Sequence, residues 1–203
     1  MTYDVLIIGG GAAGLSCAIM LGSAITQTYA KDKSIGIITH QKTSSLQNAI
    51  FNNVLGLKES ITGKEIMQTG TDQLSKLFPH VHQIESEKVQ NIIESDDAIE
   101  VITNKNSYTA KTIVVAVGPK NFSIKGLEKY KELHAKLPPE KNRTQLKNDD
   151  HQVTKNIYVA GVLAGHRSQF AIATGSGTSV ATDIMCLWNN GKPVKVHDSI
   201  IQP

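Results

Sequence analysis

Three largely apolar runs stand out along the chain, and none of them alternates with polar residues. They cover residues 5–8, 112–117 and 156–160, and a glycine follows each run directly. Short runs of this kind are typical of strands that are buried on both faces of a parallel sheet. We therefore expect the three strands to lie side by side in one central parallel sheet of an α/β fold.

Longer segments of the chain repeat their apolar residues with helical spacing. The first follows the turn after residue 8 and is expected to run to about Tyr29, the second covers residues 61–78, and the third covers Phe170–Trp188. The run Asn189, Asn190 and Gly191 is a strong C-terminal stop signal for the third helix. We expect the first and last helices to pack on the parallel sheet.

The remaining periodic segments are shorter and have mainly the pattern of strands. A second strand is expected at residues 34–39, after the first helix. An antiparallel hairpin set, ending in a buried strand, is expected at residues 81–84, 88–95, 99–103 and 108–117. Residues 42–60 form a polar loop, and residues 120–155 form a polar connector with a helical piece at 127–135.

The length of 203 residues suffices to bury the core of one domain. We expect a single domain over residues 1–203, in which residues 1–118 and 154–190 form the core and residues 119–153 form the connector. Hydrophobic residues make up 40% of the chain and charged residues 19%, which is the balance of an ordinary globular domain.

The charge pattern argues against some classes of partner. The net charge of +3 comes from scattered lysines, and the basic cluster at residues 120–131 alternates with acidic and apolar residues. Nucleic-acid binding needs a concentrated basic patch, so we expect no nucleic-acid partner. No unbroken apolar run reaches the roughly 18 residues that cross a bilayer. Asp4 stands where a signal peptide carries basic residues. We expect a cytoplasmic protein without a membrane segment.

The turn after residue 8 carries the strongest functional motif. Gly9, Gly11 and Gly14 follow a buried strand and open a helix, which is the spacing of a dinucleotide-binding turn. Gly9 permits the turn, Gly11 permits close approach of the phosphates, and Gly14 permits close packing of helix on strand. The free N–H groups from Gly11 to Ala13 would then point at the pyrophosphate. The alternative is a close-packed corner that binds nothing.

The second strand lacks the acidic residue that usually binds the adenosine ribose. In NAD-type sites an Asp or Glu stands at the end of this strand. Here the strand ends with Thr39 and His40, and Asp32 lies at its other end. Three interpretations remain open: Thr39 and His40 replace the acid as weaker partners, the ribose is held loosely, or His40 is a surface residue without a role.

Four separated stretches together resemble the FAD-binding half of the thioredoxin reductase family, within the pyridine nucleotide-disulphide oxidoreductases. They are VLIIGGGAAGLSCAI, FNNVLGLKESITGKEIM, TIVVAVGP and IYVAGVLAGHRSQFAIATGSGTSVATDI, in that order. The resemblance covers most of the chain. It implies a Rossmann-like FAD-binding fold, with a central parallel sheet and an added small antiparallel β-sheet.

The resemblance also implies which residues contact each part of FAD. A helix N-terminus at the flavin pyrimidine would favour the negative charge of a reduced flavin. The implied residues are Gly9, Gly11, Ala12, Ala13 and Gly14 at the pyrophosphate, Val89 at the adenine, Asn53 and Gly56 beside the flavin, Ala116 and Gly118 after the strand 112–117, and Gln169, Phe170 and Ala171 at the pyrimidine.

Two departures from the family pattern bear on function. Gly161 and Val162 stand where the family has Gly-Asp, and the loss of such a charge-assisted hydrogen bond costs roughly 1.5–3 kcal/mol, or one to two decades of affinity. Only roughly 40 residues separate Gly118 from Gly161, too few for the NADPH-binding domain of the family. The sequence has no second GxGxxG and no Cys-x-x-Cys. We therefore expect no dithiol reduction of thioredoxin.

The leading hypothesis is an FAD-binding oxidoreductase or electron carrier. Its electrons would come from a donor protein, from free NAD(P)H or from a small substrate, and a homodimer is compatible with it. A module that keeps the fold without catalytic flavin, and one subunit of a split reductase, are the alternatives. His166 and Arg167 lie in the loop before the last helix, either within reach of the flavin or simply exposed. We expect Cys17 and Cys186 to be buried, reduced and inert, and no metal site.

Overall fold

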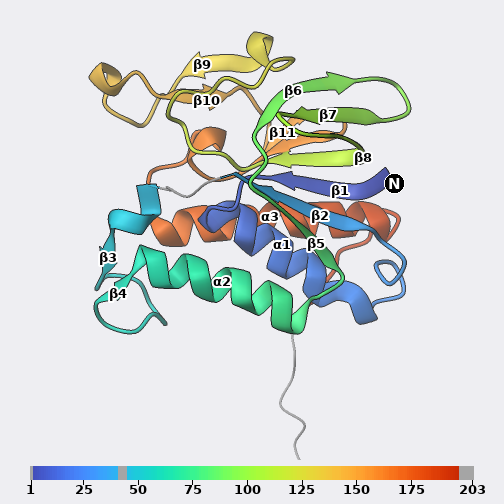
Figure 1. The fold of residues 1–203 in the computed structure, drawn as a ribbon, viewed down its shortest axis with the longest axis horizontal. Coiled ribbons are helices and arrows are strands. Elements are labelled where there is room, and N and C mark those ends of the chain that lie inside the picture. The colour runs from blue at the N-terminus through green and yellow to red at the C-terminus, as the bar shows by residue number, and fades with distance from the viewer. Residues whose placement is uncertain (1, 41–44, 197–203) are drawn as a thin grey trace, which may run out of the picture.

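Across residues 2–40 and 45–196, which are those described, the computed structural model has an eight-stranded sheet at its centre. Its main path consists of β1 (Thr2–Ile8), β2 (Ile35–Thr39), β5 (Val81–Glu85), β8 (Ser107–Val115), β11 (Gln152–Thr154) and β12 (Ile157–Val159). The spatial order is β11-β12-β8-β1-β2-β5. Figure 1 shows β8, β1, β2 and β5 as neighbours. Neighbours on this path are parallel except β11, which is antiparallel to β12. The expected parallel arrangement of the three apolar runs is confirmed.

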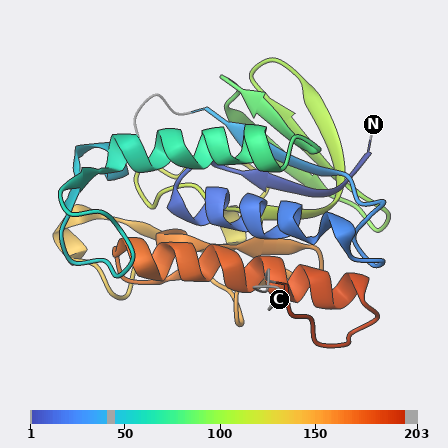
Figure 2. The same ribbon diagram turned by 90° about the horizontal axis from the view of Figure 1, so that it is seen from below.

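The helices α1 (Ala12–Ser23), α2 (Gly63–Leu77) and α3 (Phe170–Trp188) cover one face of the sheet (Figure 2). The core on this face joins Val5 and Ile7 of β1 with Leu21 of α1 and Ile184 of α3. The predicted packing of the first and last helices on the sheet is therefore confirmed. By length and composition alone α3 would also qualify as a membrane span, which is weak evidence because core helices pass the same test.

Local signals set the helix ends. α2 begins with a capping box, in which Thr62 Oγ1 accepts from the Glu65 N–H and the Glu65 carboxylate accepts from the Thr62 N–H. α3 has the bounds that its pattern predicts. α1 stops at Ser23 and continues only as the 3₁₀ turn η1 (Ala24–Thr26), so the expectation of helix to Tyr29 is wrong. The Ser23 hydroxyl donates to the Met20 carbonyl at 2.8 Å, which competes with further helical bonds.

The opposite face is covered by an antiparallel meander and the connector. β6 (Val89–Glu94) pairs with β7 (Ile99–Thr103), and β7 pairs with β8. The expectation that residues 81–84 belong to this set is wrong, because β5 pairs in parallel with β2 at the sheet edge. The helix α2 separates β2 from β5, and a crossover of that kind returns the chain to a parallel position.

The connector contains its own small sheet of β9 (Lys131–Leu133) and β10 (Thr144–Leu146), with the 3₁₀ turns η3 (Glu128–Tyr130) and η4 (Pro139–Lys141). The expected helical piece at 127–135 is therefore wrong. Pairing with β10 supplies the backbone partners that a helix would otherwise supply, so tertiary contact overrides local propensity here. The buried side chains of Phe122, Ile124, Leu127 and Leu146 attach the connector to the sheet.

The remaining short elements lie in the segment between β2 and α2 and after β12. They are η2 (Ser45–Asn48), β3 (Ile50–Phe51), β4 (Ile61–Thr62) and η5 (Gly161–Ala164). β3 lies within the polar loop that was expected at 42–60, of which residues 42–44 lie outside the described residues, and it pairs antiparallel with β4 directly before α2.

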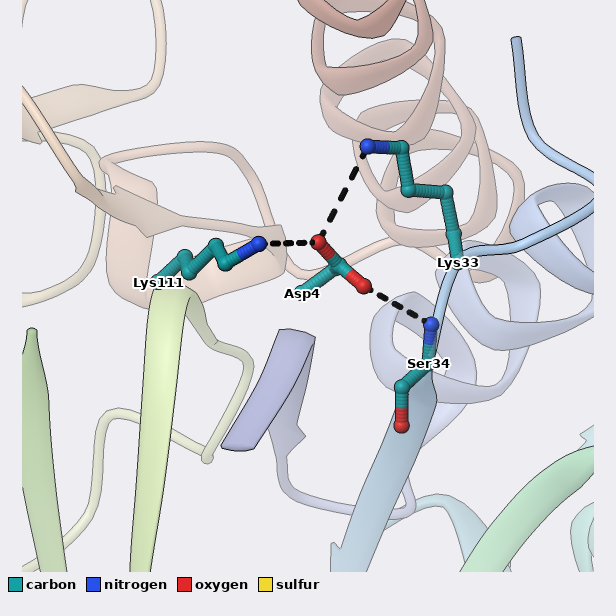
Figure 3. Close-up of polar contacts among 4 residues, drawn as sticks. All are labelled: Asp4, Lys33, Ser34 and Lys111. Atoms are coloured by element: carbon teal, nitrogen blue, oxygen red, sulfur yellow. Dashed lines mark hydrogen bonds and ion pairs between the residues drawn. The ribbon is translucent and has the colours of Figure 1, made fainter. Parts of the chain in front are cut away.

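At the amino ends of the parallel strands, Asp4 joins three neighbouring segments (Figure 3). One carboxylate oxygen accepts from Lys111 Nζ at 3.0 Å and lies 3.8 Å from Lys33 Nζ, and the other accepts from the Ser34 N–H at 3.0 Å. Burial raises the pKa of Asp4, but these partners outweigh it and hold the pKa below its ordinary value. This cluster fixes the end of the sheet that lies opposite the glycine turn.

Candidate functional site

A cavity of about 760 Å³ opens at the carboxyl ends of the parallel strands. Its walls come from the turn after β1, the end of β8 with the start of the connector, the segment after β12, and the beginning of α3. In open α/β sheets this edge is where ligands bind. Among the predicted site residues the structure brings together here Gly9, Gly11, Ala12, Ala13, His40, Val89, Ala116, Gly118, Gly161, Val162, Gln169 and Phe170.

The glycine turn shows a different constraint at each position. Gly9 has φ +116°, and a Cβ there would lie 2.7 Å from the Ala116 carbonyl oxygen. A Cβ on Gly14 would collide with the carbonyl oxygen of Gly9, so Gly14 serves packing and does not line the cavity. A Cβ on Gly11 would meet no protein atom within 4 Å. Only a bound molecule would make a side chain at Gly11 unacceptable.

Gly11 is also the N-cap residue of α1, whose first N–H groups have no acceptor within the helix. Ala12 and Ala13 line the cavity beside it. These N–H groups and the positive end of the helix dipole favour an anion such as a pyrophosphate. The start of α1 thus lies at the cavity, and its residues fit the diphosphate of a dinucleotide.

At one end of the cavity lie His40, Lys88 and Val89. His40 is exposed at the end of β2, where dinucleotide sites usually carry an acid. Thr39 does not line the cavity. Its methyl group lies where a Cβ on Gly10 would be, and its hydroxyl donates weakly to the Ile84 carbonyl at 3.5 Å. Of the two expected ribose partners, only His40 is placed for that role.

Glu87 also lines this end, and sequence reasoning missed it. Its carboxylate accepts hydrogen bonds from Thr103 Oγ1 at 2.6 Å, Asn106 Nδ2 at 2.7 Å and the Tyr108 hydroxyl at 2.9 Å. Burial raises the pKa of Glu87, but the three donors together hold it below its ordinary value. Through these hydrogen bonds the carboxylate links the turn before β6 to the turn between β7 and β8.

At the other end of the cavity lie Ser168, Gln169 and Phe170, at the start of α3. The Phe170 ring packs against Phe51 of β3, with ring centroids 5.3 Å apart. Asn53 and Ala171 are exposed and do not line the cavity, and neither does Gly56. From this loop, Asn48, Ala49 and Phe51 line the cavity, and Asn53 and Gly56 do not. An aromatic residue in an otherwise polar loop was the signal that could have identified Phe51.

Gly161 and Val162, in the segment after β12, line the cavity. Gly161 has φ +74° and donates its N–H to the buried Ser176 hydroxyl at 2.8 Å. The Val162 carbonyl accepts from His134 Nε2 at 2.9 Å and from the Gly165 N–H at 3.0 Å. The Lys136 N–H donates to His134 Nδ1, so the proton of this ring is on Nε2. The connector thereby holds the turn that carries Val162.

The start of the connector forms a wall that the sequence did not predict. Pro119, Lys120, Asn121, Phe122, Ser123 and Ile124 all line the cavity. Lys88 and Lys120 bring positive charge, while the carboxylate of Glu87 is held by its three donors. This balance favours a negatively charged ligand.

His166, Arg167 and the two cysteines, which the sequence analysis also considered, lie outside the cavity. His166 is directed to His151, with the two Nε2 atoms 3.4 Å apart, and neither His166 nor Arg167 lines the cavity. Burial and the neighbouring His151 lower the pKa of His166. Cys17 is fully buried, as predicted, and burial raises the pKa of its thiol. Cys186 is only half-buried, so the prediction that it is buried is wrong, because it lies outside the buried face of α3. Within residues 2–40 and 45–196, no group of three or more His, Cys, Asp or Glu side chains could hold a metal ion.

Comparison with known proteins gives this geometry a family. Residues 3–165 match the pyridine nucleotide-disulphide oxidoreductases. The chain belongs to this family. It is 25% identical over 142 residues to the ferredoxin–NADP reductase of Streptococcus pneumoniae, covering 65% of this chain and 41% of that protein. It is 31% identical over 127 residues to the ferredoxin–NADP reductase of Leuconostoc mesenteroides, covering 62% and 37%. The chain thus spans about two fifths of the length of these relatives.

Solved structures show the same fold. The thioredoxin reductase of Gloeobacter violaceus superimposes with a TM-score of 0.72 at 13% identity, covering 98% of this chain and 99% of that one. The ferredoxin-flavin thioredoxin reductase of Clostridium acetobutylicum gives 0.69 at 18% identity, covering 93% and 99%. The resemblance to the thioredoxin reductase fold, predicted from four stretches of sequence, is confirmed. At these identities the likeness concerns the fold.

Proposed function

We propose that the chain binds FAD non-covalently in the cavity and acts as a flavoprotein oxidoreductase or electron carrier. The observation that carries the proposal is Gly11, which caps α1 and lines the cavity, and at which a Cβ would meet open space and no protein atom, so that a ligand can approach the backbone there. Membership of the pyridine nucleotide-disulphide oxidoreductases supports a flavin as that ligand.

In this proposal each wall of the cavity holds one part of the cofactor. The adenosine lies toward His40 and Val89, and the pyrophosphate lies at Gly11–Ala13. The flavin ring lies toward Gln169 and Phe170. Lys88 and Lys120 add positive charge around the phosphates.

The chemistry itself would come from the flavin, which exchanges electrons with a donor and an acceptor when it is bound. The protein contributes binding and electrostatics. The free N–H groups at the start of α3, after its N-cap Gln169, favour negative charge on the nearest ring edge. The packed rings of Phe51 and Phe170 form an apolar wall on that side of the cavity.

The electron donor would be a separate protein or free NAD(P)H. The sequence contains no second GxGxxG and no Cys-x-x-Cys, so we do not propose a dithiol thioredoxin reductase. The names of its relatives point to ferredoxin or a pyridine nucleotide as the partner class to test first.

The test is a titration of purified protein with FAD, followed by flavin absorbance and fluorescence. We expect saturable binding by the wild type, and a loss of at least about tenfold in affinity for Gly11→Val, because one misplaced side chain against the phosphates costs more than about 1.4 kcal/mol. Gly175→Val is the matched control. Gly175 also has no neighbour within 4 Å of a Cβ, but it does not line the cavity. Wild-type affinity in Gly11→Val would refute the site, and failure of the wild type to bind FAD would refute the function.

Val162 favours a second candidate, a nucleotide-binding module without catalytic flavin. It places an aliphatic side chain in the cavity wall where the family carries an acid. Such a module would bind ADP as tightly as FAD, because only the shared adenosine diphosphate part would be recognised. A competition titration separates the two: the flavoprotein reading requires FAD to bind more tightly than ADP.

A further inference from the structure

Two histidine rings converge on one point outside the dinucleotide cavity. His151 lies in the turn between β10 and β11, and His166 lies in the loop between η5 and α3. Their Nε2 atoms are 3.4 Å apart, their ring centroids are 5.0 Å apart, and their planes are inclined by 45°. The two nitrogens are at the long limit of a hydrogen bond, and the short distance between the centroids shows that the rings are not in line with each other.

The backbone holds His151 in an unusual conformation. Asp150 and His151 have φ values of +42° and +73°, and the backbone of Asp149 and Gln152 closes the turn around them. Asp and His adopt positive φ more often than most other residues, so the turn accepts this pair. The turn fixes the position from which the His151 side chain leaves the backbone.

The ring of His151 is also oriented as a metal ligand would be. Its Nδ1 lies 3.0 Å from the Val159 carbonyl oxygen and donates to it, so the lone pair is on Nε2 and faces His166. A backbone carbonyl on the far ring nitrogen is a common orienting partner of metal-binding histidines. The ring is buried, with 7% of the residue exposed, so this orientation is fixed.

The distance between the two nitrogens fits a metal ion. Nitrogen ligands lie 2.0–2.1 Å from a tetrahedral Zn²⁺, which places two of them about 3.3–3.4 Å apart. We propose that His151 and His166 chelate one divalent transition-metal ion, of which Zn²⁺ is the model, through their Nε2 atoms. Water would fill the remaining positions, because among the described residues no third His, Cys, Asp or Glu side chain joins the pair in a metal-binding group.

The charges around the pair are mixed. Asp150 interacts electrostatically with His166, and Asp183 of α3 interacts with His151, so two carboxylates favour a cation there. Lys136 and His134 also act on His166 and oppose this effect. An open site with two protein ligands and this balance of charge is expected to bind Zn²⁺ reversibly.

A metal ion bound by His151 and His166 would join the end of the connector to the loop before α3. His151 belongs to the end of the connector, whereas His166 precedes Ser168 and Gln169, which line the cavity. The ion would fasten the loop before α3 to the connector. Zn²⁺ should therefore raise the midpoint of thermal unfolding, because it binds the folded arrangement and has no preformed site in the unfolded chain.

The test is calorimetric titration of tag-free protein with Zn²⁺, with and without FAD. We expect one ion per chain, and a loss of at least about tenfold in affinity for His166→Ala, comparable to the loss of a group that orients a metal ligand. His82→Ala is the control, because His82 is an exposed histidine on β5 away from the pair. Zn²⁺ binding that is absent in the wild type, or unchanged in His166→Ala, would overturn the proposal.

Co²⁺ provides a second measurement that does not depend on stability. Its visible absorption reports ligand type and coordination, so the wild type should develop bands that His166→Ala lacks and His82→Ala keeps. Identical spectra for all three proteins would also overturn the site. Because both tests use the metal alone, they stand whether or not the chain binds FAD.

Discussion

Gly11 and Gly14 meet different requirements, as the sequence motif predicts. A Cβ on Gly14 would collide with the Gly9 carbonyl, whereas a Cβ on Gly11 would meet no protein atom. We expect Gly14→Ala to lower the free energy of unfolding by about 1–3 kcal/mol, as overpacking does. Gly11→Ala should leave it nearly unchanged. Urea denaturation of the two variants measures the difference, and equal stabilities would show that Gly14 is not a packing position.

Val162 lines the cavity at a position where the thioredoxin reductase pattern, in the resemblance drawn from the sequence, would have an Asp. Val162→Asp would return a carboxylate to the wall, and we expect it to raise FAD affinity by about one to two decades, the worth of a hydrogen bond to a charged group. Val162→Asn, which offers the same shape without the charge, is the control and should give a smaller gain. An unchanged or weaker dissociation constant for Val162→Asp would mean that the turn of η5 does not face the cofactor.

Glu87 gives the fold a dependence on pH. Its pKa in the folded chain lies below its ordinary value, so the unfolded chain binds the proton more tightly. Its contribution to stability is therefore complete above the unfolded pKa, near 4.3, and is lost as pH falls through the lower folded value. Glu87→Gln should be less stable than the wild type at pH 7 by about 1–3 kcal/mol, and the gap should narrow toward pH 3. A gap that is constant with pH would contradict this role.

At the scale of elements, the sequence predicted those helices and strands that are set by their own residues, and it failed for strands whose pairing depends on distant residues. The strands at 5–8 and 156–160 and the helix Phe170–Trp188 are specified by their own apolar patterns and stop signals, and their predictions are confirmed. β5 and β9 were assigned wrongly, because their partners β2 and β10 are chosen by crossover topology and by pairing distant in sequence. The cavity wall from Pro119 to Ile124 was missed for the same reason.

The contact between α1 and α3 rests on small residues, and it makes a further prediction. A Cβ on Gly177 of α3 would overlap the backbone carbonyl of Ala13 in α1. Gly177→Ala should therefore push the helices apart and lower stability by about 1–3 kcal/mol. Gly175→Ala lies two positions away in open space and should instead raise stability by about 0.5–1 kcal/mol, since alanine favours the helix. Chemical denaturation of both variants decides, and two changes of the same sign would contradict the close packing.

At the scale of the whole molecule, the chain has the fold of the thioredoxin reductases. The connector lies between Gly118 and Gly161. That segment forms the small β9–β10 sheet, attached to the central sheet by Phe122 and Leu146, and it supplies one wall of the cavity. The sequence indicated a connector there but not its structure, because its short strands are stabilised by pairing and by burial of a few side chains. The cavity is thus completed by a segment without a recognisable motif.

This arrangement predicts how the chain meets a pyridine nucleotide. With the proposed FAD bound, reduction by NADPH should be slow, and its rate should rise in proportion to NADPH concentration without saturation. The reason is that the sequence has no second glycine turn to hold the nicotinamide cofactor, so each reduction depends on a collision with the flavin edge near Phe170. Anaerobic stopped-flow measurement of flavin absorbance tests this, with NADH as the comparison. Because neither nucleotide would be recognised, the two should react at similar rates. Saturation in the micromolar range typical of enzymes, or a strong preference for one nucleotide, would reveal a nicotinamide site within this chain.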